Sequence, residues 1–314
     1  MTGSEFVRVY AKKGLIAWEA AALELARQGQ LTPRAWVPIT LTDGQHTATI
    51  QVQNDVLAIG PLEDSVRLPL RPGTAQSIFN LQGWLLPTPW LVYQMWRNAP
   101  IKLSPLSAYD LKETNLGANL EQYARHSAAV DRQIAEVLTA APFTRPESPE
   151  LIAGMKKHVV VANNYQPGKV LIFGWYRPPP YPDVFDDGQL MGTPGRQPIQ
   201  PRSNVHVAEY LDYSHGIHAV HPMATVDGQR VPTASLYQHP TLSKLVSNEG
   251  PVRVPRYPSP VVPPPSEAIM SSAVPPRAPQ GFYIAPNTHG FADAYISHHL
   301  DQSLSGRYPW NRRS

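Results

Sequence analysis

Prolines determine which parts of this chain can form regular secondary structure. The 314 residues include 35 prolines, about twice the usual share, and they concentrate in two stretches, 178–201 and 251–314. Because proline lacks an amide proton and interrupts helices and sheet ladders, neither stretch can be regular over most of its length. The whole chain is nevertheless 42% hydrophobic, which is enough to build a core. We therefore expect a folded protein that is rich in loops.

Composition also excludes several kinds of chemistry. The chain has no cysteine, which excludes disulfides, thiolate metal sites and cysteine nucleophiles. The net charge is +3, but the basic residues are scattered and form no phosphate-binding stripe, so we expect no nucleic-acid partner. No apolar run is long enough to span a membrane. Nucleotide chemistry is disfavoured, because no glycine-rich loop has the strand-turn-helix context that a phosphate site needs.

Hydrophobic periodicity predicts helices and a small β-meander in the first 145 residues. The predicted helices are 15–27, 74–81, 89–96 and 119–138. The predicted strands are 36–41, 47–52, 56–59 and 66–70. In the first helix Ile16, Ala20, Leu23 and Leu25 form an apolar stripe. Thr88 and Asn119 are suitable caps for the third and fourth helices.

After residue 146 the pattern changes to strands. The extended segments are 158–162, 169–176, 205–213 and 217–226, followed by a short helix over 240–247. The turn at Gln166-Pro167-Gly168 joins the first two segments and predicts a β-hairpin. The loop 178–201 is too long for a simple connector, so we expect it to bind or cover a site. The expected fold class is α+β, with N-terminal helices and a meander, a C-terminal antiparallel sheet and a proline-rich C-terminal arm.

These patterns divide the chain into four regions. Residues 1–6 resemble a cloning scar, because Gly-Ser and Glu-Phe are encoded by common restriction sites. The region 7–145 is the N-terminal α+β part, and 146–250 is the antiparallel β part with the candidate site. The arm 251–314 contains many aromatic residues, so we expect it to wrap along the surface or along a second subunit of a homo-oligomer. Localisation stays open, and a secreted bacterial protein whose leader was removed is one alternative.

The densest group of polar side chains lies between residues 206 and 221. Four of the eleven histidines of the chain fall there. In an extended strand, successive side chains point to opposite faces. One face would carry His206, Tyr210, Asp212 and Ser214, and the other Glu209, Tyr213 and His215. Neighbouring Ser214 and His215 would meet only if a bulge or turn formed, and Gly216 is a candidate for one.

The preferred hypothesis is a serine-type hydrolase of an ester or amide bond, acting on a polymer such as cell-wall material or on a small molecule. Ser214 would be the nucleophile, because a serine hydroxyl becomes reactive only beside a base. His206 or His215 would be that base, and Asp212 would orient it. Tyr210 completes the candidate catalytic set.

Two alternatives remain open. In the first, His206, His215 and Glu209 bind a divalent metal that activates water; otherwise we expect no cofactor. In the second, the histidines and tyrosines form a hydrogen-bonded network without turnover. The protein would then be a non-catalytic glycan-binding or structural module.

Two resemblances concern the same motif. Ser214-His215-Gly216 resembles the Ser-His-Gly-Cys signature of the L,D-transpeptidases that crosslink bacterial peptidoglycan, but Ile217 stands where their nucleophilic cysteine would be, so we do not expect that activity. Residues 156–257 also resemble uncharacterised bacterial proteins that share, in the same order, four motifs. These motifs are Pro167 to Val170, Gly174-Trp175, Arg196 to Pro201 and Asp212 to Ile217. This second resemblance implies no specific activity.

Overall fold

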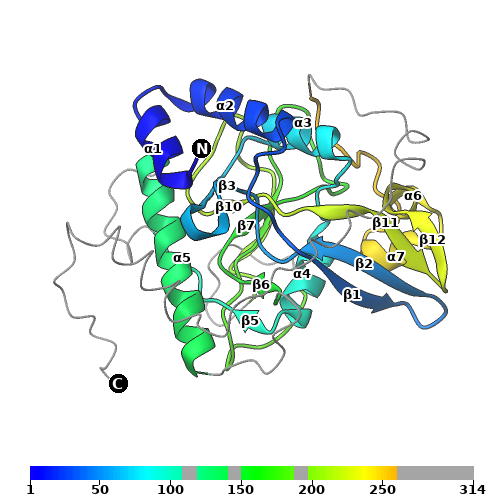
Figure 1. Cartoon of the computed structure of the whole chain (residues 1–314). Helices are drawn as coiled ribbons and strands as arrows, with labels where there is room; N and C mark the ends of the chain where they lie inside the picture. Colours follow the sequence, from blue (N-terminus) through cyan, green and yellow to red (C-terminus); the bar gives the residue numbers. More distant parts are fainter. Residues whose placement is uncertain (108–118, 141–149, 187–196, 260–314) are drawn as a thin grey trace.

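A computed structural model describes residues 1–107, 119–140, 150–186 and 197–259 (Figure 1). It combines helices with largely antiparallel sheets, so the predicted α+β class is confirmed. The helices are α1 (Gly3–Tyr10), α2 (Leu15–Arg27), α3 (Pro72–Gln82), α4 (Pro89–Asn98), α5 (Leu120–Ala140), α6 (Thr233–Gln238) and α7 (Ser243–Val246), with a 3₁₀ turn η1 (Leu62–Asp64). The strands are β1 (Trp36–Thr42), β2 (Thr47–Gln53), β3 (Ala58–Ile59), β4 (Val66–Arg67), β5 (Ile101–Lys102), β6 (Ile152–Ala153), β7 (Lys157–Val159), β8 (Ile172–Gly174), β9 (Gln200–Ser203), β10 (His215–Gly216), β11 (Val220–Val226) and β12 (Gln229–Pro232).

The longest strands form one antiparallel sheet in the order β1-β2-β11-β12. It extends to the right in Figure 1, with α6 and α7 beside it. Its inward residues alternate along β2, where Ala48, Ile50 and Val52 are fully buried. Because β11 pairs with β2, the regions 7–145 and 146–250 share this sheet. The sequence predicts 217–226 in a separate C-terminal sheet. This prediction is wrong, because the two-stranded pair β1-β2 leaves the edge of β2 open and β11 pairs with that edge.

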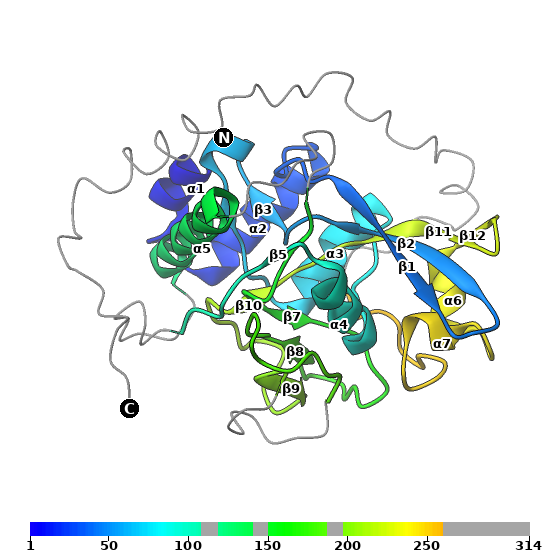
Figure 2. The ribbon, with the colours of Figure 1, turned by 90° about the horizontal axis from the view of Figure 1, so that it is seen from below.

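The second sheet has the order β10-β7-β8-β9 and lies beside α4, to its left in the view of Figure 2. The predicted hairpin is present, because β7 and β8 are antiparallel neighbours. Strand β10 instead runs parallel to β7, with His215 opposite Lys157 and Gly216 opposite His158. Glycine permits this close approach: a Cβ atom at position 216 would lie 2.7 Å from the Cβ of Lys156.

Helix α2 has the predicted bounds but presents a different face to the core. Of the predicted stripe only Leu25 is buried, together with Trp18 and Ala22, whereas Ile16 is 74% exposed and Ala20 is also exposed. Because alanines lie all around this helix, the apolar pattern does not select one face, and the large indole of Trp18 occupies the core.

The first six residues belong to the folded part. The ring of Phe6 is completely buried. Thr2 caps α1 by accepting a hydrogen bond from the amide of Glu5, and Ser4 donates its amide and hydroxyl protons to Asp64. A Cβ atom on Gly3 would lie 2.8 Å from the backbone of Asp64, so this position requires glycine.

The predicted strand 205–213 is wrong, because the segment forms turns. Lys169 makes an isolated bridge with Val207, and the amide of His215 donates to the carbonyl of Asp212.

Both predicted helix caps are confirmed. Thr88 accepts a hydrogen bond from the amide of Leu91 at the start of α4, and Asn119 accepts one from the amide of Gln122 at the start of α5.

Several predicted features lie outside the described residues. They are the boundary between the regions 7–145 and 146–250, residues 187–196 of the predicted loop, and the arm from residue 260 on, including its expected subunit contact. Within the described ranges, no helix is long and apolar enough to cross a membrane.

Candidate functional site

Asp212 is the centre of the polar cluster. Its Oδ1 atom accepts hydrogen bonds from the amide of Ser214 at 2.8 Å and from the Ser214 hydroxyl at 2.5 Å. Its Oδ2 atom accepts a 2.9 Å hydrogen bond from the hydroxyl of Tyr210. A carboxylate that bonds the backbone amide two residues later forms the turn typical of aspartate. This turn brings the side chains of Asp212 and Ser214 together. The sequence also predicts these two side chains on one side, but as neighbours on one face of a strand.

His215 lies beside this carboxylate without bonding to it. Its Nε2 atom is 3.9 Å from Oδ2 of Asp212, which is too long for a hydrogen bond. Neither ring nitrogen has a hydrogen-bond partner among the described residues, although the side chain is only 1% exposed. Burying an unsatisfied imidazole costs stability, so His215 is the least satisfied member of the cluster.

The remaining predicted residues lie on the outer side of the turn. The ring of His206 stacks on the ring of Tyr210, with centroids 3.9 Å apart and an angle of 12°. His206 and Glu209 are exposed and Tyr210 is half-buried. Among the described residues no group of three or more His, Asp or Glu side chains could hold a metal ion. His206, His215 and Glu209 are therefore not brought together as a ligand set.

Two lysines approach the cluster from β7 and the residue before it. Lys156 is buried, and its Nζ atom donates to the carbonyl of Tyr213 at 2.5 Å and lies 3.2 Å from Nδ1 of His126. Lys157 places its Nζ atom over the indole ring of Trp175, 4.3 Å from the ring centre. Nothing in the spacing of these two adjacent lysines indicates burial, so the sequence alone does not place them in the cluster.

Burial and charge fix the protonation states of the cluster. Burial alone would raise the pKa of Asp212, but the imidazole of His215, the ammonium of Lys157 and the hydrogen bonds from Ser214 lower it to about 2. Burial lowers the pKa of His215 to about 4, against the attraction of Asp212. Burial and the positive charge of Arg67 lower the pKa of Lys156 to about 7. At neutral pH Asp212 is thus charged and His215 is neutral.

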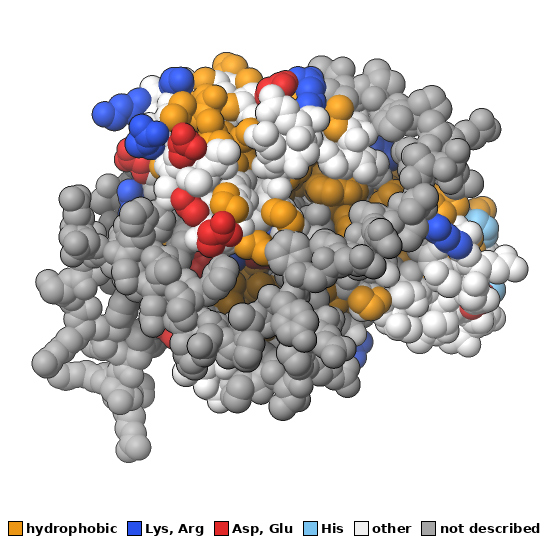
Figure 3. Space-filling model, viewed as in Figure 1, with side chains coloured by type: hydrophobic (Ala, Val, Ile, Leu, Met, Phe, Trp, Pro, Cys, Tyr) orange, Lys and Arg blue, Asp and Glu red, His pale blue; other side chains and the backbone are white. Residues whose placement is uncertain are grey.

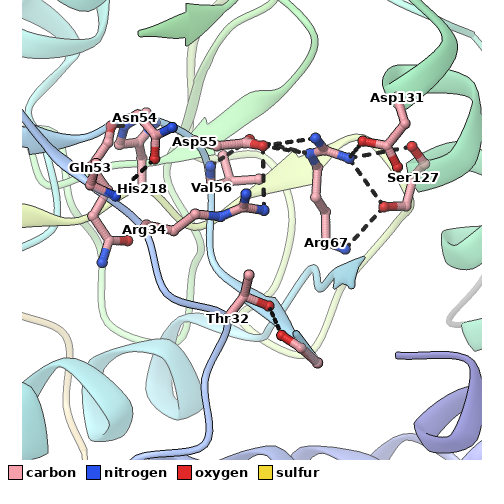
Figure 4. Close-up of polar contacts among 12 residues, drawn as sticks. Thr32, Arg34, Gln53, Asn54, Asp55, Val56, Arg67, Ser127, Asp131 and His218 are labelled. Carbon is pink, nitrogen blue, oxygen red and sulfur yellow. Dashed lines mark hydrogen bonds and ion pairs between the residues drawn. The ribbon is translucent and has the colours of Figure 1, made fainter. Parts of the chain in front are cut away.

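A second polar network is centred on Asp55 and Arg67 (Figure 4). Figure 4 shows the carboxylate of Asp55 between the guanidinium groups of Arg34 and Arg67. Arg67 continues to α5, where it bonds Asp131 at 2.7 Å and the Ser127 hydroxyl at 3.3 Å. Burial would raise the pKa of Asp55, but the two arginines lower it to about 2.

The sequence did not predict this network. Asp55 lies between the predicted strands 47–52 and 56–59, and Arg67 falls within the predicted strand 66–70. One signal was present: an arginine inside an otherwise apolar run, Val66 to Leu70, needs a buried acidic partner. The network joins β4 to α5.

The geometry decides what this cluster can do in the described conformation. A serine nucleophile needs a base within hydrogen-bond reach and access for a substrate. The Ser214 hydroxyl donates to Asp212 instead of a histidine, and Ser214 and His215 are 0% and 1% exposed. The arrangement therefore resembles a structural turn more closely than an open catalytic site.

Comparisons of the chain with protein-family models, with curated proteins and with solved structures found no match in any of the three.

Proposed function

We propose that this protein is a non-catalytic interaction module that binds a protein partner through the valine loop, residues 204–210. The proposal rests on one observation: Val205 is 73% and Val207 50% exposed, although both lie in a loop held firmly by hydrogen bonds. Exposed aliphatic side chains on a well-fixed backbone are typical of a contact surface, because binding then costs little conformational entropy.

The loop is anchored along its backbone. Lys169 donates from Nζ to the carbonyl of Val205 at 3.0 Å. The carbonyl of His206 accepts from the amide of Val170 at 3.2 Å, and the amide of Ala208 donates to Gly168 at 2.8 Å. These bonds attach the valine loop to the turn that begins β8.

The Asp212 turn supports the same loop from inside. The hydroxyl of Tyr210 is held by Asp212, and the ring of Tyr210 supports the ring of His206. The buried cluster thus has a structural role in this proposal, since it keeps an aromatic pair in place beside the two valines. Aliphatic side chains favour a protein partner over a glycan, because sugars usually stack on exposed aromatic faces and one face of Tyr210 is covered.

A single thiol can test the valine loop directly, because the chain has no cysteine. The full chain would carry a photo-crosslinker on Val205→Cys, with Val254→Cys as the control, since Val254 is also exposed, at 40%. We expect a discrete crosslinked partner from the first variant only, and we expect Val205→Ser/Val207→Ser to abolish binding of that purified partner. Equal products from both positions, or unchanged binding by the double variant, would contradict the proposal.

A hydrolase remains a second candidate, supported by the unsatisfied His215 beside Asp212. In that case the Ser214 oxygen attacks the carbonyl carbon, its proton passes to His215 and then to the leaving group, and water releases the acyl group. The hydroxyl would first have to leave Asp212 and the site would have to open. A screen of ester, peptide and glycan substrates tests this candidate. Turnover that survives in both Ser214→Ala and His215→Ala eliminates it.

A further inference from the structure

The solvent side of α2 is apolar over its first nine residues. From Leu15 to Leu23 the only charged residue is Glu19, which is 2% exposed and bonds Arg71 and Thr74. The outward side therefore carries no polar side chain over this length. Figure 3 shows the hydrophobic side chains gathered at the top of the molecule, above α2.

The opposite side of the same helix is already buried. Trp18, Ala22 and Leu25 pack into the main core, so burial of one face does not explain the apolar residues on the other. Ile16, 74% exposed, is the most exposed of the large hydrophobic side chains in the described residues. A helix that is apolar all round normally lies against something on both sides.

Basic residues border this face where α1 joins α2. Lys12 and Lys13 are exposed, and the side chain of Arg8 is 75% exposed. Glu5, on α1, lies 3.8 Å from Arg8 and offsets part of this charge. At the far end of α2, Glu24 is paired with Arg27. In Figure 3 the Lys and Arg side chains at the upper left adjoin the hydrophobic area.

We propose that the tip formed by residues 8–23 binds the surface of an anionic lipid bilayer. Ile16 would enter the boundary between headgroups and acyl chains, while Lys12 and Lys13 contact anionic headgroups. A nucleic acid would use the lysines but not the exposed isoleucine. A second copy of the chain would bring the same positive charges, whereas the bilayer supplies the opposite charge. With 13 residues, α2 is about 20 Å long and too short to span the membrane.

Vesicle co-sedimentation of the full chain tests the proposal. The probes are phosphatidylcholine vesicles with and without phosphatidylserine. We expect binding only to the anionic vesicles and a marked decrease at high salt. Lys12→Ser and Lys13→Ser should each weaken binding about fivefold, and Ile16→Ser about tenfold. The matched controls, Lys244→Ser and Val254→Ser, replace exposed residues elsewhere and should leave binding unchanged.

Three results would overturn the proposal. The first is no binding to anionic vesicles. The second is binding that Ile16→Ser and the lysine variants do not weaken. The third is a concentration-dependent dimer in sedimentation that Ile16→Ser dissociates while vesicles stay unbound, which would assign the face to a second copy. Circular dichroism of each variant ensures that weakened binding is not a failure to fold.

Discussion

The hydroxyl of Ser214 donates a 2.5 Å hydrogen bond to the carboxylate of Asp212, two residues earlier. Asp212 accepts a second bond from the Ser214 amide and a third from Tyr210. The carboxylate is therefore the acceptor on which this turn depends. Burial would raise the pKa of this carboxyl, but the charges of His215 and Lys157 and the two hydrogen bonds from Ser214 keep it low.

Asp212→Asn should destabilise the protein by about 2 kcal/mol, because the amide presents donor protons where the carboxylate accepted hydrogen bonds. Ser214→Ala removes one of the three donors and should cost only about 1 kcal/mol. Urea unfolding at pH 7 measures both values. A larger loss in Ser214→Ala than in Asp212→Asn would show that the turn does not depend on the carboxylate.

The same turn shows what the sequence can and cannot predict. Asp212 and Ser214 were correctly grouped, but an alternating pattern of polar and apolar residues does not distinguish a strand from consecutive turns. The helices α4 and α5 were predictable because periodicity and caps agree there. The pairing of β11 with β2 was not, since it joins residues about 170 positions apart and depends on which edge of the meander is left open.

The burial of charged side chains could not be predicted from the sequence either. Lys156 and Lys157 are adjacent and resemble a solvated pair, yet both are buried, because β7 lies between β8 and β10. The Asp55 network is similar: its members come from four separate segments, so only the tertiary fold brings their charges together.

Arg67→Met should destabilise the protein by about 3 to 5 kcal/mol, because it leaves the buried carboxylate of Asp55 with Arg34 alone. Asp131→Asn is the matched control. It removes a partner of the same arginine, but the Asp131 side chain is 32% exposed, so its loss should cost less than about 1 kcal/mol. Thermal or urea unfolding ranks the two. Equal losses of stability in the two variants would mean that the burial of the Asp55 carboxylate does not determine how much the network stabilises the protein.

Two glycines should respond to alanine with opposite signs. At Gly216 the new methyl group would lie 2.7 Å from the Cβ of Lys156 and 3.1 Å from Cγ1 of Val56, so β10 must move and stability should fall by about 2 kcal/mol. Gly73 lies in α3, where the nearest atom is the Pro258 carbonyl oxygen at 3.4 Å. There alanine should stabilise by about 0.5 kcal/mol through a less flexible unfolded chain. Melting temperatures that shift in the same direction would contradict this assignment.

The buried Lys156 should make stability depend on pH above neutrality. Its pKa is about 7 in the folded protein but about 10.4 in the unfolded chain. Between these values the unfolded chain binds a proton that the folded protein does not, so stability rises with pH, by up to about 1.4 kcal/mol per pH unit. Urea unfolding should show this rise in the free energy of unfolding between about pH 7.5 and about pH 9.5, because this range lies between the two pKa values.

Lys156→Met isolates this contribution, because methionine keeps most of the buried aliphatic volume and carries no charge. Burial also lowers the pKa values of Lys102 and Lys157, but both contribute equally in the parent and in the variant. The free energy of unfolding of Lys156→Met minus that of the parent should therefore decrease as pH rises across this window. A difference that stays constant with pH would mean that Lys156 remains protonated in the fold, and that its bonds to Tyr213 and His126 hold a charged ammonium.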